Sequence, residues 1–539
     1  MQADPPSIPE LVARNAALLS GHVAIEDGGV KITYAELWQA VQRTAAGLVA
    51  SGVQEQDRVA IWAPNTADWV VLALAVSSAG ATLVPINTRF KAEEAGYVLC
   101  VSRARLLFTV REFLGTRYFE QLRDRHGGAA AAQPIAGLPS LEQVVLLDAE
   151  VPGTLSLEEL RGRAAKLPER TLEARIGAVS ETFVSDILFT SGTTGRPKGV
   201  CTTHRQNLRA YRAWCDAVGL TRDDRYLVVS PFFHAFGYKA GILACQLAGA
   251  TLLPHAVFDA GRVLERLQRE SISVLPGPPT LYQSLLAQPE LSRAQLPRLR
   301  LAVTGAAVVP IELVRRMKSE LGFETIVTGY GLTESCGIAT MCRAGDDLET
   351  IAGTSGRPIE GVEVRVMTTD GRPAACGEPG EVQIRGYNVM SGYFEAQDAS
   401  REAIDADGFL HTGDIGTLDA RGNLRITDRL KDMYIAGGFN CYPAEIERVI
   451  AEHPGVAQAS VIGIPDERLG EVGMAFIVPR PGHFVDLAGE AAALERELGE
   501  FCRARMANYK VPRRFAVLPA LPLNAAGKVL KHELRAHVV

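Results

Sequence analysis

The sequence lacks closely paired cysteines. Its nine cysteines are scattered singly from Cys100 to Cys502, without a CxxC pair or a Cys/His cluster at metal-ligand spacing. Isolated thiols of this kind suit a reducing compartment. We therefore expect no disulfides, no structural zinc and a cytoplasmic location.

A large excess of charge of either sign is also missing. The formal net charge of the 539 residues is -6, and 22% of them are charged. Such a balance gives no global attraction to nucleic acid or to an anionic membrane surface. The sequence therefore predicts no nucleic-acid partner.

A continuous apolar run long enough to cross a membrane is absent as well. Residues 69–88 carry no charge, but Ser77, Ser78, Gly80 and Pro85 divide them into an apolar helix and a short strand. Residues 1–12 lack the basic and apolar regions of a signal peptide. We expect no stable membrane insertion.

What is present is a large globular chain, 47% of it hydrophobic, that is long enough for more than one domain. Residues 180–330 alternate short apolar runs with helical patterns, which is typical of βαβ units around a mostly parallel sheet. Residues 30–110 do so less regularly. Residues 123–137 read as a surface excursion without a core of its own.

The pattern of apolar and polar residues changes after Gly356. Short alternating strands with turn residues predict an antiparallel β region, and from Asp432 the pattern indicates a compact α/β unit. The predicted fold class is α/β: a large N-terminal domain of parallel βαβ layers with a β-rich subdomain, followed by a small α+β C-terminal domain.

The stretch TSGTTGRPKG, from Thr190 to Gly199, combines glycines, hydroxyl residues and a lysine. Free backbone N–H groups, hydroxyls and the Lys198 charge suit a polyphosphate at the end of a strand. The spacing differs from a Walker A loop, since the lysine precedes the last glycine. A Gly/Thr loop alone is equally consistent with a structural turn.

The whole string resembles the phosphate loop of the adenylate-forming superfamily, which includes acyl-CoA synthetases, luciferases and peptide-synthetase adenylation domains. Further matching motifs follow in the family's order: GYGLTE at Gly329–Glu334, HTGD at His411–Asp414, DRLKDMYIAGGFNCYPAEIE at Asp428–Glu447 and PLNAAGK at Pro522–Lys528. The resemblance runs from Thr33 nearly to the end of the chain. It implies an AMP-forming acid–thiol ligase that uses a carboxylic acid, ATP, Mg²⁺ and coenzyme A.

The resemblance also implies roles for individual residues around ATP. The phosphates would be held by Thr190, Ser191, Thr193, Thr194 and Lys198, and the α-phosphate also by Thr333. Glu334 would help to hold Mg²⁺ as a catalytic ligand, because a hard carboxylate oxygen suits that ion. The adenine would lie against Tyr330 and near Gly305, Ala306 and Ala307, and the ribose would be bound by Asp414 and Arg429.

Other implied roles concern catalysis and domain movement. Lys528 would bridge the attacking carboxylate and the α-phosphate. A hinge at 429–431, with Lys431 as pivot, would join domain 1–428 to a mobile domain 432–539. In a second pose Gly437 and Gly438 would approach coenzyme A.

The acid-binding residues are expected on several segments. His234, where amino-acid-selecting relatives carry an aspartate, resembles the family's aromatic gate and argues against an amino acid substrate; a core histidine is the structural alternative. The other pocket residues would be Phe233, Phe236, Pro278, Tyr282 and Gly331. Lys239 or Tyr238 could meet a ring ketone, although Lys239 also fits a solvated or structural lysine.

Some stretches resemble one branch of the family more closely, among them residues 223–245, 274–286 and 426–440. That branch acts in bacterial steroid catabolism, on the propanoate side chain of a methyl-hexahydroindanedione. A medium- or long-chain or aryl-acid CoA ligase, a luciferase-type oxidase and a non-catalytic nucleotide-binding protein remain as alternatives. The sequence leaves homodimerisation open.

Overall fold

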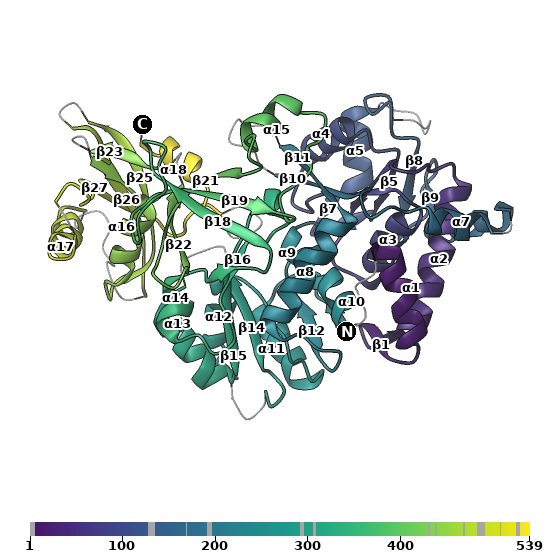
Figure 1. Ribbon diagram of the computed structural model, residues 1–539, viewed down its shortest axis with the longest axis horizontal. Coiled ribbons are helices and arrows are strands. Elements are labelled where there is room, and N and C mark those ends of the chain that lie inside the picture. The colour runs from purple at the N-terminus through teal and green to yellow at the C-terminus, as the bar shows by residue number, and fades with distance from the viewer. Residues whose placement is uncertain are drawn as a thin grey trace.

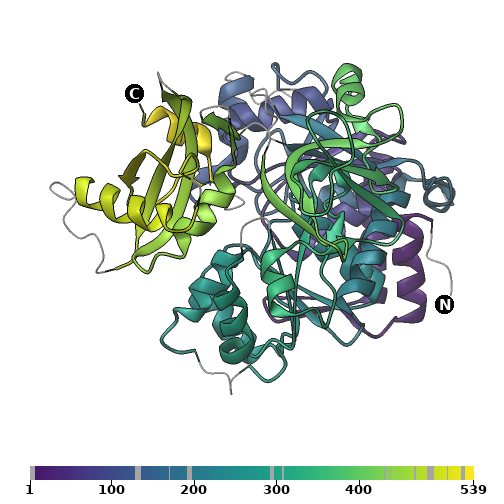
Figure 2. The same cartoon turned by 60° about the vertical axis from the view of Figure 1, so that its left-hand side comes forward.

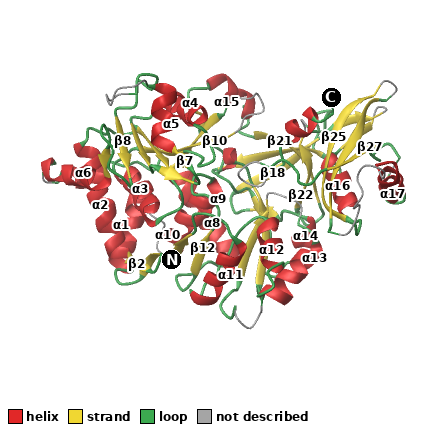
Figure 3. Cartoon of the chain, turned by 180° about the vertical axis from the view of Figure 1, so that it is seen from behind, coloured by secondary structure: helices red, strands yellow, loops and turns green. Residues whose placement is uncertain are grey.

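The computed structural model describes residues 6–127, 135–168, 170–190, 197–291, 296–305, 309–429, 432–436, 439–466, 469–481, 491–506, 508–523 and 529–538. Within these ranges the chain forms two large sheets, three smaller sheets and the helices that cover them (Figure 1). The smallest sheet is the pair β6 (Glu112–Phe113) and β7 (Thr116–Arg117). Helices α1 (Ile8–Leu18), α2 (Tyr34–Ala50) and α6 (Leu157–Gly162) gather at one end of the molecule (Figure 3).

The first large sheet has eight strands in the order β20-β11-β10-β4-β3-β5-β8-β9. Their bounds are Gly392–Tyr393, Lys198–Thr203, Val184–Thr190, Thr82–Pro85, Arg58–Trp62, Leu106–Thr109, Gln143–Leu146 and Leu155–Ser156. The pairs from β10 to β9 are parallel, whereas β11 pairs antiparallel with both neighbours. Burial on both faces explains why these strands read as continuous apolar runs.

Helix α3 (Ala67–Ser78) packs beside this sheet and buries every residue from Trp69 to Ser78. Thr66 caps it by accepting a hydrogen bond from the Trp69 amide, and β4 begins at Thr82. The prediction of an apolar helix followed by a short strand over residues 69–88 is confirmed. None of the described helices is long and apolar enough to cross a membrane.

The second large sheet is assembled from two four-stranded parts, β2-β1-β13-β12 and β14-β15-β16-β17. Val274 joins them through single parallel bridges to Tyr226 and Leu301. The strand bounds are Val30–Thr33, Val23–Asp27, Thr251–Pro254, Arg225–Val228, Leu301–Gly305, Thr325–Tyr330, Thr340–Met341 and Arg357–Pro358. The apolar run around Val274, expected as a strand, is thus reduced to one bridging residue, since Pro276 and Gly277 follow it.

The helices between these strands match the expected βαβ pattern. Their bounds are α8 His204–Val218, α9 Ala235–Gly237, η2 Tyr238–Leu243, α10 Ala244–Ala248, α11 Ala260–Arg269, α12 Pro279–Leu286, α13 Ile311–Arg316 and η4 Met317–Leu321. Thr203 and Gln206 form a capping box at the start of α8. The π-helical segment η2 lies between α9 and α10 and is continuous with both.

Part of residues 123–137, which were expected as a surface excursion without a core of its own, is helical or buried. Helix α5 (Tyr118–His126) extends into this stretch, after α4 (Ala92–Ser102), and Ile135 and Leu138 are buried in the main core. The side chains that directly follow residues 128–134 therefore belong to the main core. Two further short helices, α7 (Thr171–Gly177) and α14 (Leu348–Gly353), lie elsewhere in this part of the chain.

The region after Gly356 forms the predicted antiparallel sheet, in the order β18-β19-β21-β22. Its strands are Val362–Met367, Gly380–Gly386, Leu410–Leu418 and Leu424–Arg429, with helix α15 at Gln397–Ala403. Gly371 and Gly422 have positive φ in the turns that precede β19 and β22. The sequence pattern therefore identified this sheet correctly.

The C-terminal residues form a separate α+β unit, seen in yellow and light green in Figure 2. Strands β24-β23-β26-β25 are joined by β27, which pairs with β26. The bounds are β23 Tyr434–Ala436, β24 Phe439–Cys441, α16 Pro443–Ala451, β25 Val456–Asp466, β26 Gly470–Pro479, α17 Ala491–Arg503, β27 Arg514–Val517 and α18 Lys531–Ala536. Its apolar clusters are distinct from the main core, which agrees with the predicted fold class.

Candidate active site

The Gly/Thr loop connects two antiparallel strands, which we call the phosphate hairpin (β10 and β11). Thr190 at the end of β10 pairs with Lys198 at the start of β11. The two ends of the loop are therefore held side by side, with Lys198 half-buried at its base. Ser191, Thr193 and Thr194 lie outside the described residues.

Lys198 faces a group that the sequence reasoning did not select. Its Nζ lies 5.1 Å from the centre of the Tyr393 ring, and the Tyr393 hydroxyl donates a 3.0 Å hydrogen bond to Oε1 of Glu334. Burial, with the neighbouring Glu334 charge, raises the pKa of the Tyr393 phenol, so it remains a donor. One aromatic ring thus connects the loop lysine to the GYGLTE carboxylate.

Backbone pairing fixes this arrangement. Tyr393 lies on the edge strand β20, opposite Val200 of β11, and the Met390 amide donates to the Glu334 carbonyl at 2.8 Å. Thr333 and Glu334 lie in a short 3₁₀ turn, η5 (Thr333–Ser335), and both are half-buried. A two-residue strand around a Gly-Tyr pair carries no local sequence signal, which explains why Tyr393 was missed.

A second contact joins the GYGLTE and HTGD motifs. The Tyr330 hydroxyl donates to Oδ2 of Asp414 at 2.6 Å, and Asp414 is 3% exposed. Asp414 lies opposite Arg429 in the β21–β22 pair. Three residues predicted for adenine and ribose therefore lie within one small region, although the Arg429 side chain is outside the described part.

Glycines shape the neighbouring strand ends. Gly305 pairs with Gly329, and a Cβ on Gly305 would lie 2.9 Å from the Gly329 carbonyl oxygen. A Cβ on Gly331 would lie 2.4 Å from the Ile338 amide nitrogen. Side chains are therefore excluded where the backbone segments approach most closely. Ala306 and Ala307 lie outside the described residues.

His234 lies in a loop that precedes the π-helical segment. Its side chain is open to water, its Nδ1 accepts a 3.2 Å hydrogen bond from the Phe236 amide, and Phe233 and Phe236 are half-buried. Surrounding protein groups displace much of the ring's hydration and, with the Lys239 charge, lower the pKa of His234. His234 is therefore an exposed ring that is fixed by a backbone hydrogen bond and flanked in sequence by two half-buried phenylalanines.

Other predicted pocket residues differ in position. Pro278 is half-buried at the start of α12, whereas Tyr282 is fully buried and its hydroxyl donates to the carbonyls of Leu275 and Val303 at 2.8 and 3.2 Å. In this conformation Tyr282 therefore belongs to the core. Lys239 is also fully buried and pairs with Asp186, so it is neither solvated nor open to a ring ketone here.

Four residues of the C-terminal region were predicted for catalysis, for the hinge or for binding coenzyme A. Lys431, Gly437, Gly438 and Lys528 lie outside the described residues. The loop that contains Lys528 is closed at its base, because Leu523 bridges Val529 and the Leu530 amide donates to the Pro522 carbonyl at 2.8 Å. Convergence of Lys198 and Lys528 on one nucleotide remains a prediction.

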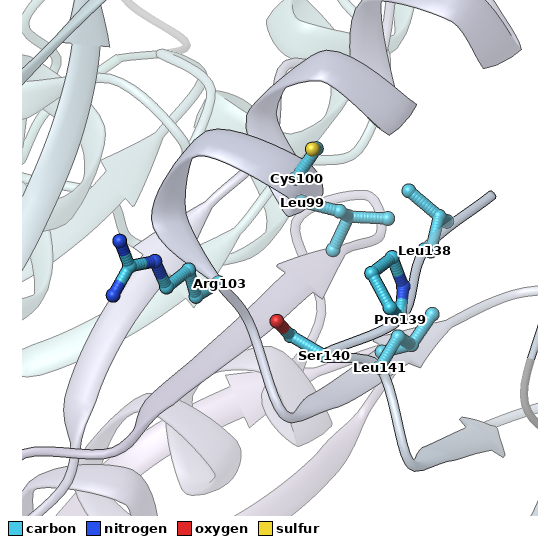
Figure 4. A pocket seen from close by; sticks show the side chains of 7 residues that line it. All are labelled: Leu99, Cys100, Arg103, Leu138, Pro139, Ser140 and Leu141. Carbon is cyan, nitrogen blue, oxygen red and sulfur yellow. The ribbon is translucent and has the colours of Figure 1, made fainter.

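A small recess elsewhere lies between the end of α4 and residues 138–141 (Figure 4). Leu99, Leu138 and Leu141 make it mostly apolar, while Arg103 points away and forms an ion pair with Glu395 at 2.9 Å. It lacks the clustered hydroxyls and charges that bind a nucleotide.

Comparison with known proteins agrees with this geometry. Residues 12–394 match the family described as AMP-binding enzyme, and residues 445–528 match the AMP-binding enzyme C-terminal domain. The chain belongs to the AMP-binding enzyme family. The predicted enzyme class is thereby confirmed as that of an AMP-forming acyl-CoA ligase.

Two relatives resemble this AMP-binding enzyme over almost its whole length. Each is named 3-[(3aS,4S,7aS)-7a-methyl-1,5-dioxo-octahydro-1H-inden-4-yl]propanoyl:CoA ligase. The protein from Mycobacterium tuberculosis is 50% identical over 98% of both chains, and that from Rhodococcus jostii is 46% identical over 99% of both. ATP-bound MatB from Rhodopseudomonas palustris superposes with a TM-score of 0.83, at 29% identity over 98% of both chains.

Proposed function

We propose that this ligase activates the propanoate side chain of a methyl-substituted bicyclic diketone and transfers it to coenzyme A. The main support is the full-length identity of 46% and 50% to two ligases named for that acid. The half-buried phenylalanines Phe233 and Phe236, on either side of the exposed His234, are compatible with a broad and mostly apolar acid.

The reaction would proceed in two steps. A carboxylate oxygen bonds to the α-phosphorus of ATP while the bond to pyrophosphate breaks. The coenzyme A sulfur then bonds to the acyl carbon while the bond to AMP breaks, and the thiol proton passes to solvent. Because the first step brings anions together, Lys198 and Lys528 would stabilise the charge that accumulates there.

The nucleotide would be held by two groups of residues. Thr190, Lys198 and the intervening hydroxyls would bind the phosphates, and Asp414 and Arg429 would bind the ribose. The 2.6 Å contact of Tyr330 with Asp414 supports a shared surface for adenine and ribose. Thr333, one residue before Glu334, would reach the α-phosphate.

Mg²⁺ fits the residues around Glu334. The described residues contain no group of three or more His, Cys, Asp or Glu side chains that could hold a metal ion by themselves. Mg²⁺ is commonly bound by one or two carboxylates together with substrate phosphates and water. Glu334, hydrogen-bonded to Tyr393, would therefore supply the protein oxygen, and the bound ion would neutralise phosphate charge.

The C-terminal unit would alternate between two poses about a hinge at 429–431. In one pose Lys528 would serve adenylation, and in the other Gly437 and Gly438 would approach coenzyme A. The separate apolar clusters of residues 432–539 support this division from residues 1–428. Homodimerisation is compatible with this arrangement.

An acid screen tests the proposal. The purified enzyme is given ATP, Mg²⁺ and coenzyme A with the bicyclic propanoate, octanoate or ferulate, and pyrophosphate and thioester are measured. We expect the highest kcat/KM for the bicyclic acid. A preference for octanoate or ferulate would assign the enzyme to another acid class, and ATP binding without acid-dependent pyrophosphate release would indicate a non-catalytic protein.

A further inference from the structure

An ion pair between Lys239 and Asp186 lies inside the protein. The Lys239 Nζ lies 3.0 Å from Oδ2 of Asp186, and both side chains are 0% exposed. The same Nζ donates to Oγ1 of Thr202 at 2.8 Å. Buried charges are costly unless they are paired and hydrogen-bonded, so this pair depends on its specific partners.

The Asp186 carboxylate is fully coordinated by hydrogen-bond donors. Its Oδ1 accepts from Ser185 Oγ at 2.9 Å and from Asn207 Nδ2 at 2.5 Å. Its Oδ2 accepts from Thr202 Oγ1 at 2.7 Å in addition to Lys239. These directional hydrogen bonds fix the position of the Asp186 carboxylate and, through it, that of the Lys239 ammonium.

The network lies on a particular face of the phosphate hairpin. Asp186 pairs with Thr202 across β10 and β11, and Thr190 pairs with Lys198 farther along the same strands. Alternate residues of a strand point to one face, so both pairs occupy the same face. Lys239 is therefore attached to the side of the hairpin from which Lys198 projects.

Lys239 directly follows the segment that contains His234, residues 230–238, which we call the acyl loop. Asn65 fixes its beginning, donating to the Ser230 carbonyl at 2.9 Å and accepting from the Phe232 amide at 2.8 Å. A Cβ on Gly237 would lie 2.1 Å from the Pro231 carbonyl oxygen, so the loop folds tightly upon itself. Its other end enters η2, and π-helical turns are frequent at functional sites.

We propose that Lys239 is a positioning residue that fastens the acyl loop to the phosphate hairpin. It thereby sets the distance between the acid carboxylate and the α-phosphate. This inference rests on the proposed function, because it takes Phe233, His234 and Phe236 as walls of the acid site. Small displacements of a bound acid reduce adenylation strongly, whereas the residues predicted to bind ATP, among them Lys198 and Asp414, lie outside the loop.

The test removes both charges while keeping a polar partner for Ser185, Asn207 and Thr202. In the double variant Lys239→Met/Asp186→Asn, the new amide oxygen can accept from Ser185 and Asn207, and its nitrogen can donate to Thr202. We expect a folded enzyme whose kcat/KM for the acid falls at least about tenfold, while KM for ATP changes by less than about twofold. Unchanged acid kinetics, or equal changes for acid and ATP, would overturn the proposal.

A matched control is the pair of Arg300 and Asp224, in which Arg300 Nε donates to Asp224 Oδ1 at 2.8 Å away from the acyl loop. Arg300→Met/Asp224→Asn should lower the melting temperature without changing KM for the acid. If the Lys239 double variant does not fold, Thr202→Val decides the question: a rise in acid KM alone supports positioning, and an unchanged acid KM contradicts it. Failure of the proposed function would be distinct, because the unmodified enzyme would then prefer another acid or show no acid-dependent pyrophosphate release.

Discussion

Tyr393 donates a 3.0 Å hydrogen bond to the Glu334 carboxylate, and the face of its ring is occupied by the Lys198 ammonium. The ring therefore contacts both a cation and a carboxylate from two motifs that are predicted to bind the nucleotide and its metal ion.

Removing the Tyr393 hydroxyl should weaken this arrangement. Tyr393→Phe keeps the ring beneath Lys198 but removes a hydrogen bond to a charged group, which contributes about 1.5–3 kcal/mol. We expect kcat/KM for MgATP to fall about tenfold and half-saturation to require more Mg²⁺. Tyr387→Phe is the control, because Tyr387 also packs against a cation, Arg209, at 4.0 Å. An identical Mg²⁺ dependence in Tyr393→Phe and the unmodified enzyme would contradict the assignment.

The Asp414 carboxylate should recognise the ribose hydroxyls. Asp414→Asn removes charge-assisted hydrogen bonds, so KM for ATP should rise at least about tenfold. With 2′-deoxy-ATP, Asp414→Asn should raise KM by a smaller factor, because this nucleotide already lacks one of the hydroxyls that Asp414 would bind. KM values for both nucleotides in both enzymes test this coupling. A penalty of the same size with each nucleotide would place the ribose elsewhere.

Lys528 should act in adenylation only. Lys528→Ala removes a cation from the transition state, so pyrophosphate release should fall by at least about a hundredfold with ATP affinity nearly unchanged. Thioester formation from supplied acyl-AMP should persist. Parallel loss of both half-reactions would argue against this role.

The proposed hinge makes a different prediction. Lys431→Pro restricts the backbone at the pivot, so one half-reaction should be retained while the other is lost. Single-turnover assays of adenylation and thioester formation measure the two separately. Unchanged rates in both assays would exclude Lys431 as the pivot.

Acid should destabilise the fold through His204. This side chain is 1% exposed, and its Nδ1 accepts from the Ile8 amide at 3.3 Å, which requires an unprotonated nitrogen. Burial lowers the pKa of His204 from 6.5 to about 4, despite the opposing charge of Asp186. The unfolded chain therefore binds the proton more readily, and stability should fall by about 3 kcal/mol as the pH drops from 6.5 to 4.

His204→Asn tests this linkage, because its side-chain oxygen can still accept from Ile8 but does not titrate. The free energy of unfolding is measured in urea between pH 7 and pH 4. The substituted protein should lose less stability over this interval. Equal slopes in the two proteins would show that other groups control acid unfolding.

Much of the fold was predictable because local patterns record it. The buried run around α3, the alternating strands after Gly356 and the C-terminal α/β unit each correspond to an element of the structure. Which strands share a sheet was not predictable, since Val274 joins two parts of a sheet through single bridges. Such pairing depends on contacts distant in sequence.

The candidate site was predictable where a motif is continuous. Thr190 and Lys198 belong to one string, and the structure pairs them. Tyr393 was missed because its role comes from contacts with two distant segments. Lys239 was ambiguous for the same reason, since a lysine reads as solvated until its buried partner Asp186 is located.

Among the described residues, the apolar clusters of the C-terminal unit do not merge with the main core. If the unit turns as proposed, the movement would expose little apolar surface, and packing would favour neither pose strongly. Modest differences in how each ligand touches the two poses would then suffice to choose between them. Binding of a substrate and release of a product would then determine when the unit turns, without a separate energy source.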